Sequence, residues 1–177
     1  DQVQVHVNCG EPGASDEAKE RLTAAGVDLD KIIFTHIADT NFYVRDNGPS
    51  VMVDGEGNRL LVNPNWSYYG VGDPSDPVMV QSRASGLMMG IGLGVFDVVN
   101  SDFVSEGGDR EFNGKGILIA IEDTEVRKRN PGKTREEVEA EYKRIYNLEK
   151  IIWLPKPMLE DDDYRVAPLD YKEDGTP

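Results

Sequence analysis

The chain has 177 residues, of which 38% are hydrophobic and 8% aromatic, as expected of a globular domain with a core of its own. Its 19 Lys and Arg residues against 33 Asp and Glu residues give a net charge of −14. This charge argues against nucleic acid or an anionic membrane as a partner and would suit a cationic substrate, although solubility is the simpler explanation. The sequence has no apolar run long enough to cross a bilayer.

The hydrophobic pattern at the start of the chain predicts a strand, a helix and a second strand. Alternation over residues 3–7 is typical of a half-buried strand. Ser15 is expected to cap a helix over residues 16–25, which Gly26 ends, and residues 31–36 form the next strand.

A hairpin and a helix are predicted next. Residues 50–53 and 59–62 flank an Asp-Gly-Glu-Gly-Asn turn, which indicates two antiparallel strands. Asp76 is expected to cap a helix with Pro77 at its first position, and this helix runs to Met89.

The pattern then returns, with strands predicted at residues 95–99, 117–121 and 151–154. A hairpin turn at residues 113–116 leads into the second of these strands. Thr134 and Glu137 form a capping-box pattern for a helix over residues 135–146. The order strand, polar loop, hairpin, helix therefore occurs twice, which indicates an internal repeat.

Both polar loops of the repeat carry an acid beside glycine. We call Arg45-Asp46-Asn47-Gly48-Pro49 the Asp46 loop and Glu106-Gly107-Gly108-Asp109 the Glu106 loop. Related units that present carboxylates from matching loops predict a shared site, although acids and glycines are common in loops of every kind.

Four other polar residues receive simpler interpretations. Cys9, the only cysteine, follows a predicted strand and is interpreted as a small buried residue rather than a nucleophile. His6 and His36 are interpreted as core histidines within apolar strands. Asp109 is interpreted either as a structural loop residue or as part of the site. No metal or cofactor is expected.

Several stretches follow one another in an order known from a protein family. An aromatic-x-Arg-Asp-x-Gly-Pro motif, residues 43–49, follows the strand Phe34-Thr35-His36-Ile37. Ser105-Glu106-Gly107-Gly108 precedes Asn113-Gly114-Lys115-Gly116, and Arg129-Asn130-Pro131 comes next. Together these motifs resemble the agmatine deiminase and Porphyromonas-type peptidylarginine deiminase family, within the guanidine-modifying pentein superfamily.

The resemblance implies an α/β fold that forms part of a five-fold pseudosymmetric propeller of ββαβ-type units. About two units and the start of a third are expected, at residues 1–75, 76–157 and 158–177, the last an acidic loop or tail. It also implies hydrolysis of a guanidinium group to a ureido group with release of ammonia. In this reaction a Cys thiolate attacks, a His acts as acid and base, and two acids hold the planar cation.

The resemblance assigns roles to five residues. Asp46 matches the first guanidinium-binding acid, with a turn residue bonded to its own backbone as the alternative, and Glu106 matches an acid close to the catalytic His. Tyr43 matches an aromatic along the substrate's stem, and Trp66 and Tyr69 fall in an aromatic loop near the pocket. Packing alone would also explain all three aromatics.

The sequence departs from the family at three places. The His-x-Asp expected after Pro155 is replaced by an acidic stretch that includes residues 160–163. The C-terminal Cys nucleophile and the family's segment before the first strand are absent. We therefore expect a nicked enzyme, cleaved near residues 170–177, or an incomplete chain. A complementary chain or segment would supply the His and Cys, and this chain alone would be inactive.

The identity of the guanidine is open among agmatine, arginine and peptidylarginine. Residues 66–70 include no basic side chain to hold a carboxylate, which favours agmatine or a guanidine within a larger molecule. A homo-oligomer is compatible with the sequence, and a secreted or periplasmic location is favoured over the cytoplasm. A non-catalytic pentein-like binding module and an acidic protein-interaction domain are the alternatives to an enzyme.

Overall fold

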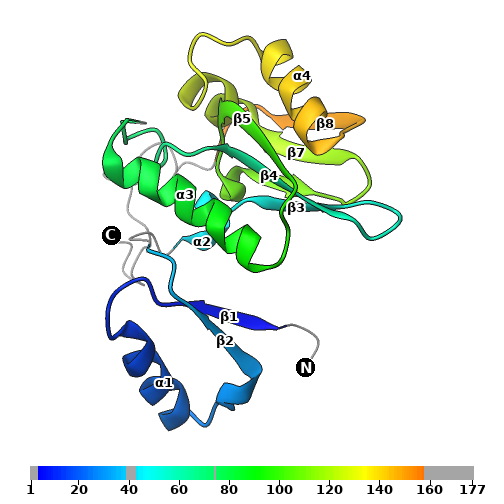
Figure 1. Ribbon diagram of the computed structural model, residues 1–177. Coiled ribbons are helices and arrows are strands. Elements are labelled where there is room, and N and C mark those ends of the chain that lie inside the picture. The colour runs from blue at the N-terminus through cyan, green and yellow to red at the C-terminus, as the bar shows by residue number, and fades with distance from the viewer. Residues whose placement is uncertain (1–3, 39–42, 74, 158–177) are drawn as a thin grey trace, which may run out of the picture. The chain divides into compact units, whose positions relative to one another are not determined.

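A computed structural model describes residues 4–38, 43–73 and 75–157 (Figure 1). They form a mixed α/β fold with two compact units, Asp1–Gly108 and Asp109–Pro177, which are described separately. Over the described part of the chain, no helix is both long and apolar enough to cross a membrane. The acidic stretches at residues 160–163 and 170–177 lie outside the described residues.

The first unit opens with a βαβ element. Strands β1 (Val5–Asn8) and β2 (Ile32–Thr35) pair in parallel, and helix α1 (Ala14–Ala24) connects them (Figure 1). The predicted elements are confirmed, but the predicted cap is wrong, because Ser15 lies inside the first turn of the helix. Gly13 precedes the helix with a φ of 81°, a conformation that glycine adopts without steric cost.

A three-stranded sheet follows in the order β3-β4-β5. Strands β3 (Ser50–Val53) and β4 (Arg59–Asn65) form the predicted antiparallel hairpin. Helix α3 (Pro77–Gly92) then crosses over, and β5 (Val98–Val104) pairs in parallel with β4. The strand predicted at residues 95–99 thus begins three residues too early.

Helix α3 begins at its predicted cap, where the Asp76 carboxylate accepts a backbone N–H at 2.7 Å. It continues three residues beyond Met89, which delays β5. A Cβ at Gly90 would lie 2.7 Å from a Leu61 methyl carbon, so this glycine lets the helix pack directly onto the sheet. Packing here outweighs the low helix propensity of glycine.

The Asp46 loop contains a helical turn that the sequence did not predict, α2 (Val44–Asn47). Helix α3 lies directly against this turn. A Cβ at Gly86 would be only 2.2 Å from the Asn47 carbonyl oxygen. The Asn47 side-chain amide also donates to the Ser82 carbonyl at 3.2 Å. Asp46 therefore stands on a turn that a packed helix holds in place.

The second unit repeats the connectivity of the β3-β4-β5 sheet. Strands β6 (Arg110–Phe112) and β7 (Ile117–Ile121) are antiparallel, helix α4 (Arg135–Tyr146) follows, and β8 (Lys150–Leu154) pairs in parallel with β7 (Figure 1). The predicted order of hairpin, helix and parallel strand is therefore present twice in the chain.

Helix α4 has the predicted capping box. The Thr134 hydroxyl accepts the Glu137 N–H at 3.1 Å, and the Glu137 carboxylate accepts the Thr134 N–H at 2.8 Å. A π-helix (Asp123–Lys128), which the sequence did not predict, precedes it and carries the fully buried Glu125. The Tyr142 hydroxyl donates to the Glu125 carboxylate. Among the residues of this unit that the structure describes, the buried hydrophobic side chains are Leu118, Ala120, Val126, Val138, Tyr142, Ile145, Tyr146 and Ile151.

The cysteine and the two histidines differ in their surroundings. Cys9 is buried, as predicted. His36 is exposed and follows β2, so its interpretation as a core residue is wrong, because the strand ends one residue earlier. Its Nδ1 lies 3.2 Å from the Cys9 carbonyl oxygen. His6 is half-buried on β1.

Replacing Gly86 should test whether α3 fixes the position of α2. We expect Gly86→Ala to lower the free energy of unfolding by about 1–3 kcal/mol, because the new methyl group meets a backbone carbonyl. Gly92→Ala is the matched control in the same helix, since nothing lies within 4 Å of its Cβ position. Urea denaturation would measure both, and equal stability of the two variants would contradict the proposed contact.

Candidate active site

Asp46 on α2 and Tyr69 in the loop after β4 form the centre of the candidate site. The Tyr69 hydroxyl donates to Asp46 Oδ2 at 2.6 Å, a short hydrogen bond of the kind that an ionised acceptor makes. This contact joins segments 23 residues apart. It differs from the bond to its own backbone that the turn-residue interpretation of Asp46 requires.

The backbone around Tyr69 has an unusual conformation. Tyr68, Tyr69 and Gly70 have successive φ values of 49°, 60° and 78°. Bulky side chains rarely adopt this left-handed region, and such residues cluster at functional sites. Ser67 supports the turn, because its hydroxyl accepts the Gly70 N–H at 3.0 Å and its carbonyl accepts that of Gly72 at 3.0 Å. The turn directs the Tyr69 side chain toward Asp46.

The three predicted aromatic residues lie together. Trp66 is buried, and its ring meets the Tyr69 ring edge-on with centroids 5.1 Å apart. Tyr43 is 45% exposed, and its ring also meets the Tyr69 ring edge-on, with centroids 6.2 Å apart. Trp66 therefore forms the buried base of the cluster, while Tyr43 faces solvent.

The Glu106 loop lies directly against the Asp46 loop. A Cβ at Gly107 would be 2.0 Å from the Arg45 carbonyl oxygen, and one at Gly108 would be 2.8 Å from Asp46 Oδ1. A side chain at position 107 would force the loops apart, and one at position 108 would displace the Asp46 carboxylate. Glu106 itself is 2% exposed. The two loops that the sequence analysis paired therefore meet within the first unit.

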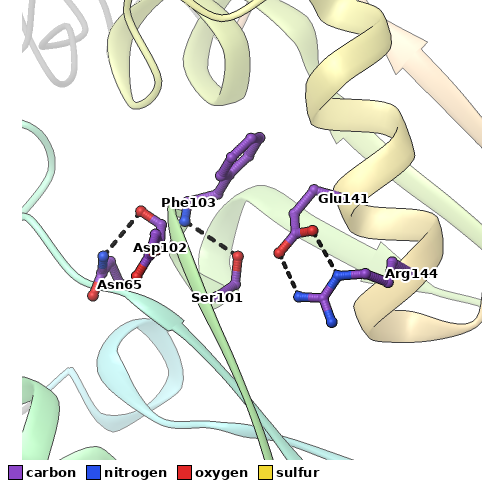
Figure 2. Close-up of polar contacts among 6 residues, drawn as sticks. All are labelled: Asn65, Ser101, Asp102, Phe103, Glu141 and Arg144. Carbon is purple, nitrogen blue, oxygen red and sulfur yellow. Dashed lines mark hydrogen bonds and ion pairs between the residues drawn. The ribbon is translucent and has the colours of Figure 1, made fainter.

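The ends of strands β4 and β5 explain why the Glu106 loop starts beside residues 66–70. The Asn65 side chain donates to the Asp102 carbonyl at 2.9 Å (Figure 2) and accepts from Arg83 at 3.1 Å. The Asn65 carbonyl accepts the Ser105 N–H at 3.0 Å. These bonds hold two parallel strand ends side by side, so the Trp66–Gly70 segment and the Glu106 loop leave from the same edge of the sheet.

The electrostatics of the cluster are negative. Burial raises the pKa of Tyr69 well above its usual range, and the hydrogen bond and charge of Asp46 raise it further, followed by the charges of Glu106 and Tyr43. The phenol thus stays a neutral donor at physiological pH. Carboxylates beside aromatic rings suit a flat organic cation with several N–H donors.

Asp109 is the remaining candidate residue, and it is not part of the cluster around Asp46 and Tyr69 described above. Asp109 is half-buried at the end of a 3-10 turn, Gly107–Asp109, and belongs to the second unit. Within the described residues, no group of three or more His, Cys, Asp or Glu side chains is arranged to hold a metal ion. Sequence reasoning missed the roles of Gly107 and Gly108, although a Gly-Gly pair beside an acid is a signal of close backbone approach.

Comparison with known proteins identifies the family. The model of the Porphyromonas-type peptidyl-arginine deiminases matches residues 1–167. The chain belongs to this family. The matched residues include all the motifs on which the resemblance was based.

A relative agrees with this assignment, and solved structures share the fold. An agmatine deiminase of Pseudomonas syringae pv. syringae is 30% identical over 150 residues, which are 83% of this chain and 39% of that protein. The structure of Enterococcus faecalis agmatine deiminase matches with a TM-score of 0.70 and 21% identity over 86% of this chain and 40% of that one. The structure of C. jejuni agmatine deiminase matches with a TM-score of 0.67 and 18% identity, over 85% of this chain and 41% of that one. This deiminase-family chain therefore spans about two fifths of the length of these relatives.

The charge of Asp46 should be measurable at Tyr69. We expect Asp46→Asn to lower the pKa of Tyr69, because tyrosinate no longer forms beside a negative carboxylate. The pKa should stay above the usual value for tyrosine, since burial remains. An NMR pH titration of ring-labelled tyrosines would measure it, with the exposed Asp97→Asn as the control for loss of one charge. An unchanged Tyr69 pKa in Asp46→Asn would contradict this coupling.

Proposed function

We propose that this chain supplies the guanidinium-binding part of a deiminase, which hydrolyses a guanidinium group to a ureido group and ammonia. The observation that carries the proposal is the Asp46 carboxylate, which is held by Tyr69 at 2.6 Å against the Glu106 loop. Membership of a deiminase family supports the reaction type.

The side chains divide the work of binding among them. A guanidinium offers paired N–H donors in one plane, and Asp46 would accept two of them as a fork. Tyr43 and Tyr69 would flank the cation and its stem, above the buried Trp66. Glu106 would add buried negative charge and orient the catalytic His. Asp109 is proposed as a further contact with the substrate.

The nucleophile and the acid–base group come from outside this chain in our proposal. Cys9 is the only cysteine and is 5% exposed at the end of β1. His6 lies on β1, and His36 directly follows β2. A thiolate and a His on a complementary chain or segment would complete the site, either in a nicked enzyme or in a longer protein. Coverage of about two fifths of the relatives is consistent with this arrangement.

We further propose that the two sheets are units of a five-fold pseudosymmetric propeller, with boundaries near residues 75 and 157. The shared connectivity of β3-β4-β5 and β6-β7-β8 supports the repeat. The likeness to solved agmatine deiminases supports the same fold.

The proposed substrate is agmatine or another guanidine that lacks a free carboxylate. Residues 66–70 offer no basic side chain to pair with a carboxylate. The net charge of −14 also favours a cation without a negative group. Arginine would place its carboxylate in an environment that repels it.

A ureido-product assay over agmatine, arginine and a peptidylarginine tests the proposal. The 177-residue chain should give no product by itself, because it lacks the nucleophile. In the complete assembly, Asp46→Asn should lower the rate by about a hundredfold or more, as when one contact to a charged transition state is removed. Asp97→Asn is the control, since it removes an exposed acid of the same unit.

Two outcomes would contradict different parts of the proposal. Product formed by the 177-residue chain alone would refute the external nucleophile. Unaltered turnover by the Asp46→Asn assembly would refute the assignment of Asp46. Circular dichroism of each variant would confirm that the fold is retained.

A further inference from the structure

We infer that the Tyr69 hydroxyl is a positioning group, which fixes the Asp46 carboxylate in the orientation that receives a guanidinium. The inference rests on the guanidinium-binding role proposed above for Asp46. It assigns to Tyr69 a function beyond that of an aromatic wall, because it concerns the hydroxyl and not the ring.

The two oxygens of Asp46 have different surroundings. Oδ2 accepts the Tyr69 hydroxyl at 2.6 Å. Oδ1 lies on the side of Gly108, 2.8 Å from the position that a Cβ would take there, so this glycine leaves room for the oxygen. Rotation of the carboxylate would break the contact of Oδ2 with the Tyr69 hydroxyl. Each carboxylate oxygen has two lone-pair positions, so Oδ2 can keep Tyr69 and still accept an N–H from a guanidinium.

Ring packing does not explain the hydroxyl. The edge-on contacts of Tyr69 with Trp66 and Tyr43 involve the ring, and phenylalanine would make them equally well. Tyr68 provides a comparison within the same turn, with the same residue type and a φ of 49°. Its hydroxyl makes no hydrogen bond to any described residue, and its ring also packs on Trp66. Of these two tyrosines, Tyr69 alone directs its hydroxyl to an acid.

A phenol is suited to this task because it is neutral. A lysine or arginine at position 69 would also fix Asp46, but it would cancel the negative charge that a cationic substrate needs. Tyr69 stays protonated in this acidic cluster, so it donates a hydrogen bond and leaves the charge of Asp46 in place. The acid is thus oriented before the cation arrives, and less ordering is required on binding.

Tyr69→Phe in the 177-residue chain tests the inference, with Tyr68→Phe as the matched control. We expect Tyr69→Phe to weaken agmatine binding about tenfold, the size of effect expected when a hydrogen bond to a charged group is lost. Tyr68→Phe should change it by less than about twofold, because its hydroxyl has no described acceptor. NMR titration of each variant would measure the dissociation constants.

A second measurement separates positioning from packing. Side-chain couplings of Asp46 in the chain without ligand should report one χ1 rotamer in the wild type and in Tyr68→Phe, and averaging among rotamers in Tyr69→Phe. A single rotamer in Tyr69→Phe, or agmatine binding that is unchanged or tighter in this variant, would overturn the inference.

Asp46→Asn distinguishes this failure from failure of the proposed function. If Asp46→Asn weakens agmatine binding while Tyr69→Phe does not, only the positioning role of Tyr69 is refuted. If the wild-type chain does not bind agmatine, or if Asp46→Asn binds as tightly as the wild type, the guanidinium site itself is refuted and the inference fails with it.

Discussion

The close approach of two backbone segments is the constraint on which the candidate site depends. Gly107 meets the Arg45 carbonyl at a distance that excludes a Cβ, and a Cβ at Gly108 would displace the Asp46 carboxylate. The Asp46 loop and the Glu106 loop can therefore touch without a side chain between them. Bringing two acids together is unfavourable in itself, so the surrounding fold has to impose this contact.

The parallel pairing of β4 and β5 imposes it. Helix α3 returns the chain to the neighbouring strand position, and small residues on its buried face, Gly86 and Gly90, let it press against α2 and against the sheet. Because the two strands are parallel, their carboxyl ends lie at one edge, where Asn65 holds them together. The same helix thus positions both loops, one through the sheet and the other through α2.

Local signals and tertiary packing contributed differently to what could be predicted. The hairpins, the Asp76 cap and the Thr134 capping box depend on neighbouring residues, and the sequence predicts them correctly. The meeting of the two loops follows from the repeat. Helix α3 extends beyond its predicted end, β5 begins later than predicted, and the helical turn α2 was not predicted. These features depend on packing at glycines, which the hydrophobic periodicity of the sequence does not reveal. The contact of Tyr69 with Asp46 requires positive φ at two tyrosines, against their ordinary preference.

A phenol–carboxylate hydrogen bond occurs in each of the two units, and the two bonds differ in their burial. In the second unit, the hydroxyl of Tyr142 on α4 donates to Glu125 on the preceding π-helix, and both residues are fully buried. Neither side chain is accessible to a ligand in the folded unit, so this pair is part of the core. In the first unit, Asp46 and Tyr69 are only half-buried and Tyr43 beside them faces solvent. The same hydrogen bond leaves a charged acid within reach of a cation, which is the condition that a binding site requires and a core does not.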